Sequence, residues 1–184
     1  MNYPIDEKYT WKIPSKPLNL PDIPLEGEEG TYYHFHVKKI NTEKFIKGNP
    51  FFEWLAENYK FSCGLIKMEP NKLYDWHIDA ASKTKINRGV CINALVTPSP
   101  SLVLFTDNLT NLMAHGGEEF QTDIIPFTYD LNEIYLFNTA RAHSVYNFEK
   151  ERLLFTLEFE LEYPLLTYER VKNKIKTEFL NEHE

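Results

Sequence analysis

The chain has 184 residues, a hydrophobic fraction of 42% and a net charge of −7, so it is long and apolar enough for one domain with a buried core. The acidic total argues against a nucleic-acid-binding protein, because basic side chains that neutralise phosphates supply most of the affinity in that class. No apolar run reaches the ~18 residues of a membrane span, and the N-terminus lacks the features of a secretory signal. We therefore expect a cytoplasmic protein with no membrane partner.

Residues 1–30 form a proline-rich N-terminal arm that contains five of the 11 prolines. Proline lacks a backbone donor and restricts the residue before it, so we expect an extended or irregular segment lying along the domain. Residues 32–37, YYHFHV, are predicted to form one strand. His34 and His36 share a face of that strand with a spacing that can bind zinc, but no third ligand is near in sequence, and we interpret both as structural.

Two helices are predicted to flank a β-rich segment. Asn49 followed by Pro50 is typical of an N-cap with proline at the first helical position, and the first helix would run through residues 51–59. The second would occupy residues 166–182, where helical spacing returns. Their apolar stripes, which we expect to pack on the β core, are Phe51, Trp54, Leu55 and Tyr59 in the first helix and Val171, Ile175 and Phe179 in the second.

Between residues 61 and 163 the pattern changes to short β-type runs separated by turn signals such as EPNK and PSPS. So many short strands in about a hundred residues indicate a sandwich, a jelly roll or a barrel. Cys63 and Cys91 each lie in one of these runs, and two cysteines without CxxC spacing are interpreted as buried thiols. We find no internal repeat, so we expect a single domain over residues 1–184. The runs are FSCGLIKM, LYDWHID, GVCINALV, SLVLF, FQTDIIPF, EIYLFN, HSVYNF and RLLFTLEFEL.

The second of these runs contains His77 and Asp79. Residues i and i+2 of a strand point to the same face, so the imidazole and the carboxylate would converge. Such a pair supplies two of the three facial ligands of a non-haem iron. The short motif also arises by chance, and a salt-bridged pair on a surface strand is the alternative interpretation.

A further histidine, His143, opens a strand-like run after a long gap, and Arg152 begins the next run nine residues later. A hairpin between these runs would bring Arg152 into the pocket that His143 lines. The planar guanidinium group could hold a distal carboxylate there through two parallel hydrogen bonds. The alternatives are a core histidine and an arginine that pairs with Glu149 or Glu151.

The order HxD, a long gap, HSVxN and then Arg resembles the iron- and 2-oxoglutarate-dependent dioxygenase superfamily over residues 60–163. The tail is most similar to the aspartyl/asparaginyl hydroxylase-like and amino-acid hydroxylase branch, in which Asn and then Arg-apolar-apolar follow the distal histidine. The resemblance implies a double-stranded β-helix (a cupin-like jelly roll) in which His77, Asp79 and His143 hold Fe(II). It also implies that 2-oxoglutarate chelates the iron, that Arg152 binds its C5 carboxylate, and that O2 takes the remaining position.

The activity implied by this resemblance is hydroxylation of an amino-acid, peptidyl or small-metabolite substrate with release of succinate and CO2, with no catalytic residue beyond the metal site. Asn93 stands where some relatives carry a histidine, and Tyr135, Tyr74 and Thr156 are candidates for a hydroxyl that assists the arginine. The candidate substrate contacts are Trp76, Arg88, Asn138 and Arg141, although a solvated surface position is the simpler interpretation of the two arginines. Residues 106–119, with His115, are predicted to be a loop over the pocket mouth or a plain surface loop.

Three other function classes fit parts of the same pattern. A cupin-type metalloenzyme without 2-oxoglutarate would share the fold, but such sites usually contain more histidines. A non-enzymatic or degenerate jelly-roll module is opposed by the presence of all three ligand types. A nucleic-acid demethylase of the same superfamily is opposed by the acidic charge and by the lack of a second arginine soon after Arg152. Fold alone does not identify a substrate.

Overall fold

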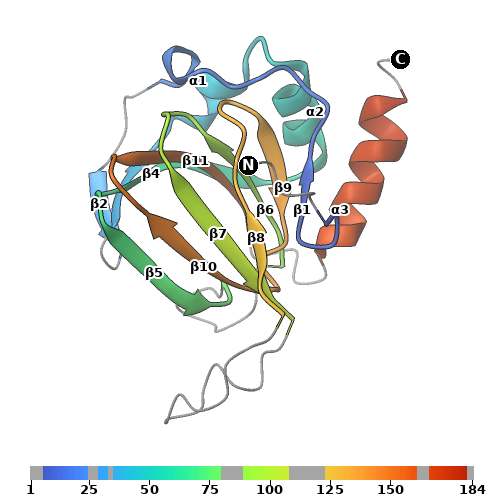
Figure 1. The fold of residues 1–184 in the computed structure, drawn as a ribbon. Helices are drawn as coiled ribbons and strands as arrows, with labels where there is room; N and C mark the ends of the chain where they lie inside the picture. Colours follow the sequence, from blue (N-terminus) through green and yellow to red (C-terminus); the bar gives the residue numbers. More distant parts are fainter. Residues whose placement is uncertain are drawn as a thin grey trace.

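The computed structural model describes residues 6–24, 29–32, 35–79, 89–107, 123–160 and 166–181. Its strands form two sheets that face each other (Figure 1), one with the order β1-β9-β6-β11-β4-β3-β2 and the other with the order β5-β10-β7-β8. The strands are β1 (Thr10–Lys12), β2 (Glu29–Tyr32), β3 (Phe35–Lys39), β4 (Phe61–Met68), β5 (Lys72–His77), β6 (Cys91–Leu95), β7 (Ser101–Thr106), β8 (Ile125–Phe127), β9 (Ile134–Phe137), β10 (Ala142–Asn147) and β11 (Arg152–Phe159).

The way in which the strands from β4 through β11 pair with one another defines the fold. β7 pairs with β8, β6 with β9, β5 with β10 and β4 with β11, and each of these pairs is antiparallel. The strands from β4 to β11 therefore form one long hairpin whose two arms coil together, so that four of these strands fall in each sheet. Additional pairing of β6 with β11 and of β7 with β10 joins successive turns of the coil. This winding is the double-stranded β-helix, or jelly roll, and the fold class expected from the sequence is confirmed.

Two segments near the N-terminus extend the larger sheet. β1 pairs with β9 at one edge, and the β2–β3 pair joins β4 at the other. The single strand predicted over residues 32–37 is wrong: β2 ends at Tyr32, β3 begins at Phe35, and these two residues are register partners. Strong β propensity in the run of aromatic residues cannot by itself reveal a reversal of the chain.

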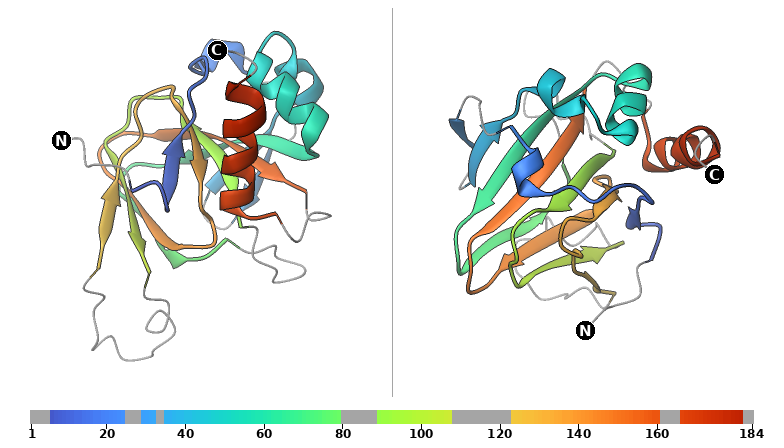
Figure 2. Two further views of the ribbon diagram at one scale, coloured as in Figure 1. Left: turned by 90° about the vertical axis from the view of Figure 1, so that its right-hand side faces the viewer. Right: turned by 90° about the horizontal axis from the view of Figure 1, so that it is seen from above.

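The helices cover the outer face of the larger sheet (Figure 2). They are a short 3-10 turn (Leu20–Asp22), α1 (Thr42–Ile46), α2 (Pro50–Asn58), α3 (Tyr168–Lys174) and its continuation as a π-helix (Ile175–Leu180). The side chain of Asn49 accepts hydrogen bonds from the first turn of α2, as an N-cap does. Both predicted apolar stripes are buried in the cluster between the helices and the sheet. The helices lie close to the predicted ranges, but Tyr59 falls just beyond α2 in an extended conformation, and the C-terminal helix covers Tyr168–Leu180.

β11 separates this helix-packed core from the interior of the jelly roll. Phe155, Leu157 and Phe159 on one face of the strand join the cluster beneath the helices, whereas Arg152 and Thr156 on the other face line an internal cavity. Side chains alternate along a strand, so a single strand can serve both layers. The helices thus brace the sheet from behind while its inner face remains available to the cavity.

The expectation about the two cysteines is also tested. Cys63 and Cys91 are both buried, and neither forms a disulfide, as predicted. Within the described part of the chain, no helix is long and apolar enough to cross a membrane.

Candidate metal centre

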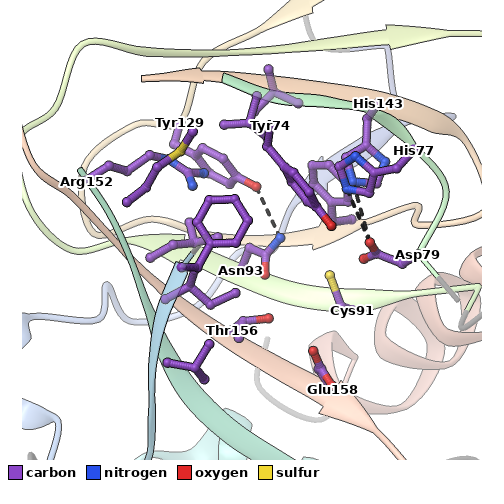
Figure 3. A pocket seen from close by; sticks show the side chains of 18 of the residues that line it. Tyr74, His77, Asp79, Cys91, Asn93, Tyr129, His143, Arg152, Thr156 and Glu158 are labelled. Carbon is purple, nitrogen blue, oxygen red and sulfur yellow. Dashed lines mark hydrogen bonds and ion pairs between the residues drawn. The ribbon is translucent and has the colours of Figure 1, made fainter. Parts of the chain in front are cut away.

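A cavity of about 440 Å³ opens between the two sheets. Much of its wall is apolar, with residues from β3, β4, β7 and β11. The polar side chains that line it come from segments far apart in the sequence (Figure 3), and they include Tyr74, His77, Asp79, Asn93, Tyr129, His143, Arg152, Thr156 and Glu158. An apolar cavity with a few convergent polar groups is the usual form of a small-molecule site.

His77 enters this cavity because β5 is irregular just before it. His77 and Tyr74 of β5 face His143 and Val145 of β10, so a three-residue step on one strand matches a two-residue step on the other. The extra residue changes the side-chain alternation, and it turns both Tyr74 and His77 inward, as bulges beside active sites do. The ring Nδ1 of His77 lies 2.6 Å from the carbonyl oxygen of Asp75 in the same irregular segment.

Asp79 reaches the site by a different route from the one the sequence suggested. β5 ends at His77, so the two residues do not share the face of one regular strand. The backbone N–H of Asp79 donates to the carbonyl oxygen of Thr139, at 3.3 Å, in the turn before β10. Asp79 is therefore held in place by a contact between segments that are distant in sequence. The sequence correctly predicted that Asp79 lies beside His77, but this contact brings the two residues together, not a shared face of one strand.

His143 lies at the start of β10 and is almost completely buried, with 5% of its surface exposed. Its Nδ1 is 2.9 Å from the carbonyl oxygen of Arg141. A carbonyl can only accept, so Nδ1 must carry the proton, and Nε2 presents its lone pair to the cavity. Burial lowers the pKa of His143 to about 4, against the opposing effect of Asp79. The ring is neutral at pH 7, as a metal ligand must be.

The three side chains meet at one point. One ligand atom from each of His77, Asp79 and His143 lies within 4.8 Å of the others. The Asp79 Oδ1 atom is 3.5 Å from His77 Nε2 and 3.9 Å from His143 Nε2. Both imidazoles use Nδ1 for a backbone carbonyl and leave Nε2 for the shared point, which is the second-sphere arrangement of histidine ligands. Two imidazoles and one carboxylate fit the facial triad of a non-haem iron.

Arg152 faces the same cavity from the opposite sheet. It was expected to reach the pocket through a hairpin, but β10 and β11 belong to different sheets, so the connection between them passes from one sheet to the other. The side chain is only 4% exposed, and its Nε has no hydrogen-bond partner among the described residues. The guanidinium group lies 5.7 Å from the ring centre of Tyr129, and burial lowers the pKa of Arg152. A buried cation with an unsatisfied donor is a site that an anion would complete.

Tyr129 is the residue near Arg152 that sequence reasoning missed. Its hydroxyl accepts a hydrogen bond from the Asn93 side chain at 3.2 Å (Figure 3), and the Oδ1 of Asn93 is buried without a partner among the described residues. Tyr74 and Thr156 also line the cavity, whereas Tyr135 does not: its hydroxyl donates to Asp130 at 3.0 Å. No motif marks Tyr129, because it lies between strands and reaches the site only through the fold.

The other predicted contacts lie away from the cavity wall. Asn138 is bonded to the backbone of Lys8, and Arg141 is ion-paired with Asp107 at 3.0 Å. Trp76 lies on β5 but is not among the lining residues. Arg88, His34, His115 and most of the predicted loop at residues 106–119 lie outside the described residues. The cavity is lined instead by Glu158 of β11 and by Gly30 and Thr31 of β2, which the sequence did not single out.

Comparison with known proteins gives structural likeness only. No protein-family model matches the sequence, and no curated protein matches it. Among solved structures, a prolyl-4-hydroxylase from Pseudomonas putida has a TM-score of 0.49 and 13% identity, covering 72% of this chain and 77% of that one. A 2OG-Fe(II) oxygenase family oxidoreductase from Burkholderia pseudomallei has a TM-score of 0.46 and 12% identity, covering 73% and 72%.

The similar structures also include the cupin domain of Drosophila melanogaster CENP-C, with a TM-score of 0.42 and 10% identity, covering 73% of this chain and 76% of that one. Scores and identities this low carry no argument about function. The assignment of the fold therefore rests on the strand pairing, and the interpretation of the site rests on its own side chains.

Proposed function

We propose that this protein is an Fe(II)- and 2-oxoglutarate-dependent oxygenase. The observation that carries the proposal is the buried Nε of Arg152, which has no hydrogen-bond partner among the described residues. Arg152 lines the same cavity as the cluster of His77, Asp79 and His143. A metal cluster alone would suit many chemistries. A metal cluster that shares a cavity with a buried guanidinium group suits a ligand that chelates the metal at one end and carries a carboxylate at the other.

Each group in the cavity has a distinct task in this proposal. His77, Asp79 and His143 would hold the iron and would leave positions open for other ligands. Arg152 binds the C5 carboxylate of 2-oxoglutarate through its planar fork, and Tyr129 and Asn93 flank that end. The apolar wall excludes water from the reacting groups.

When bound, the iron supplies the site at which O2 and 2-oxoglutarate react, so that substrate, O2 and 2-oxoglutarate give hydroxylated substrate, succinate and CO2. The chain's own contribution is to bind and orient these molecules. A cavity of about 440 Å³ suits a small molecule or a single inserted side chain. The proposed substrate is therefore an amino acid, a peptidyl side chain or another small metabolite.

Anaerobic titration with Fe(II) and then 2-oxoglutarate tests the proposal, because chelation of the iron by the cosubstrate gives a visible charge-transfer band. The wild-type protein is expected to develop the band, and His77→Ala to lose it. His36→Ala is the matched control, since His36 lies on β3 and is exposed outside the cavity. Iron binding without the band, or an unchanged band in His77→Ala, would refute the assignment.

Turnover is followed as succinate release coupled to oxygen uptake in the presence of candidate amino acids, peptides and metabolites. A metalloenzyme that uses no 2-oxoglutarate would consume oxygen without releasing succinate. A binding module would hold iron tightly without consuming 2-oxoglutarate under any substrate.

A further inference from the structure

The turn formed by residues 138–141 contacts two of the three proposed metal ligands. The carbonyl oxygen of Thr139 accepts the backbone N–H of Asp79 at 3.3 Å, and the carbonyl oxygen of Arg141 accepts Nδ1–H of His143 at 2.9 Å. One short segment thus sets both the position of a carboxylate and the orientation of an imidazole. A contact that holds this turn in place therefore also holds the two proposed metal ligands in their positions.

Asn138 is the residue that organises the turn. Its Oδ1 accepts the backbone N–H of Ala140 at 3.2 Å, and its own carbonyl oxygen accepts the backbone N–H of Arg141 at 3.2 Å. A side-chain amide that closes a turn on the backbone two residues ahead is an Asx-turn. The side chain is only 8% exposed, so these bonds are shielded from competition with water.

The same asparagine ties the turn to the N-terminal arm. Its Nδ2 donates to the carbonyl oxygen of Lys8 at 2.8 Å, and its backbone N–H donates to the carbonyl oxygen of Tyr9, also at 2.8 Å. The orientation of the amide is self-consistent, because its nitrogen meets a carbonyl and its oxygen meets an N–H. A second link lies on the surface, where Asp107 pairs with both Lys8 and Arg141.

We propose that Asn138, bonded to the backbone of Lys8 and Tyr9, is a positioning residue that holds Asp79 and His143 in metal-binding geometry. The proposal gives Lys8 and Tyr9 of the N-terminal arm a role in the geometry of the site, although no described residue of the arm is among the proposed ligands. It rests on the proposed role of Asp79 and His143 as metal ligands. Asn138 itself is neither one of the proposed ligands nor part of the cavity wall, and it acts only through the turn.

Two substitutions at one position separate the contacts. Asn138→Ala removes both side-chain bonds. Asn138→Asp keeps the acceptor for Ala140 but sets a carboxylate oxygen against the carbonyl oxygen of Lys8, so we expect it to share most of the defect. Tyr168→Phe is the matched control: it removes the hydrogen bond at 2.8 Å from the Tyr168 hydroxyl to the carbonyl oxygen of Glu7, which anchors the adjacent residue of the arm without touching the turn.

The first measurement uses the metal-free protein and requires no activity. Imidazole 15N–1H spectra report which ring nitrogen of His143 carries the proton. We expect the Nδ1–H form to dominate in the wild type and in Tyr168→Phe, and a mixture of the two tautomers in both Asn138 variants. Should the alanine variant fail to fold, the nearly isosteric aspartate variant still gives the answer.

The second measurement is titration with Co(II), an air-stable substitute for Fe(II), followed by its visible absorption. Loss of an outer-shell partner typically weakens metal binding roughly 10- to 100-fold, and we expect a loss of that size in the Asn138 variants but not in Tyr168→Phe. Unchanged His143 tautomers and unchanged Co(II) affinity in folded Asn138 variants would overturn the proposal. A wild-type protein that binds metal but does not bind 2-oxoglutarate when it is added would defeat the proposed function alone.

Discussion

Replacing Arg152 by methionine distinguishes a ligand-binding arginine from a structural one. The guanidinium group is buried, and its Nε has no partner among the described residues. An unsatisfied buried donor costs ~1–3 kcal/mol, and the cation–π contact with Tyr129 returns ~0.5–2 kcal/mol. The cost of the unsatisfied donor is therefore similar to, or larger than, the gain from the cation–π contact. Without ligand, Arg152→Met should be at least as stable as the wild type.

Binding of 2-oxoglutarate should respond very differently. Two charge-assisted hydrogen bonds to a carboxylate together contribute about 3 kcal/mol or more, which corresponds to roughly a 150-fold rise in Kd. Iron binding should be unchanged, because Arg152 is not a ligand. A ligand that binds only the folded state raises its stability as its concentration passes Kd, so millimolar 2-oxoglutarate should stabilise the iron-loaded wild type and not the variant.

The assay is chemical unfolding of the iron-loaded protein under anaerobic conditions, with and without 2-oxoglutarate, and of the metal-free protein alone. Arg170→Met is the control, because Arg170 is an exposed arginine on α3. If Arg152→Met keeps its 2-oxoglutarate affinity within a few-fold, the proposed carboxylate site is wrong. If it loses several kcal/mol of stability without ligand, Arg152 is a structural residue.

Two further outcomes are expected. Tyr129→Phe removes the acceptor of the Asn93 amide but keeps the ring over Arg152. The Kd for 2-oxoglutarate should therefore rise about five- to tenfold (~1 kcal/mol), and the affinity for iron should not change. Calorimetric titration measures both affinities, and an unaltered Kd would show that Tyr129 is not part of the 2-oxoglutarate site. The pKa of His143 is lowered to about 4 in the folded protein, so between pH 6.5 and 4 the unfolded chain binds a proton that the folded protein does not. The metal-free wild type should therefore lose about 2 kcal/mol of stability between pH 7 and pH 5 because of this residue. The loss in His143→Gln should be smaller than in the wild type by that amount. Urea unfolding measures both, and equal losses in the two proteins would contradict the assignment.

Local patterns determined much of the architecture. The strand predicted at residues 61–68 matches β4, the Asn49 N-cap begins α2 as expected, and Val171, Ile175 and Phe179 are buried together. Alternation along strands and the spacing of helical turns are properties of neighbouring residues, so they can be read from the sequence directly. The candidates His77, Asp79, His143 and Arg152 could also be named from the sequence, because their order and residue types carry the pattern.

Only the tertiary structure decided how those side chains meet. The sequence suggested one strand for His77 and Asp79 and one hairpin for His143 and Arg152, whereas a bulge turns His77 inward and β10 and β11 lie in opposite sheets. The roles assigned to Tyr129 and Asn138 arise from contacts with residues far away in the chain. Such contacts depend on sheet register and on the closure of long loops, and neither is encoded by the identity of adjacent residues.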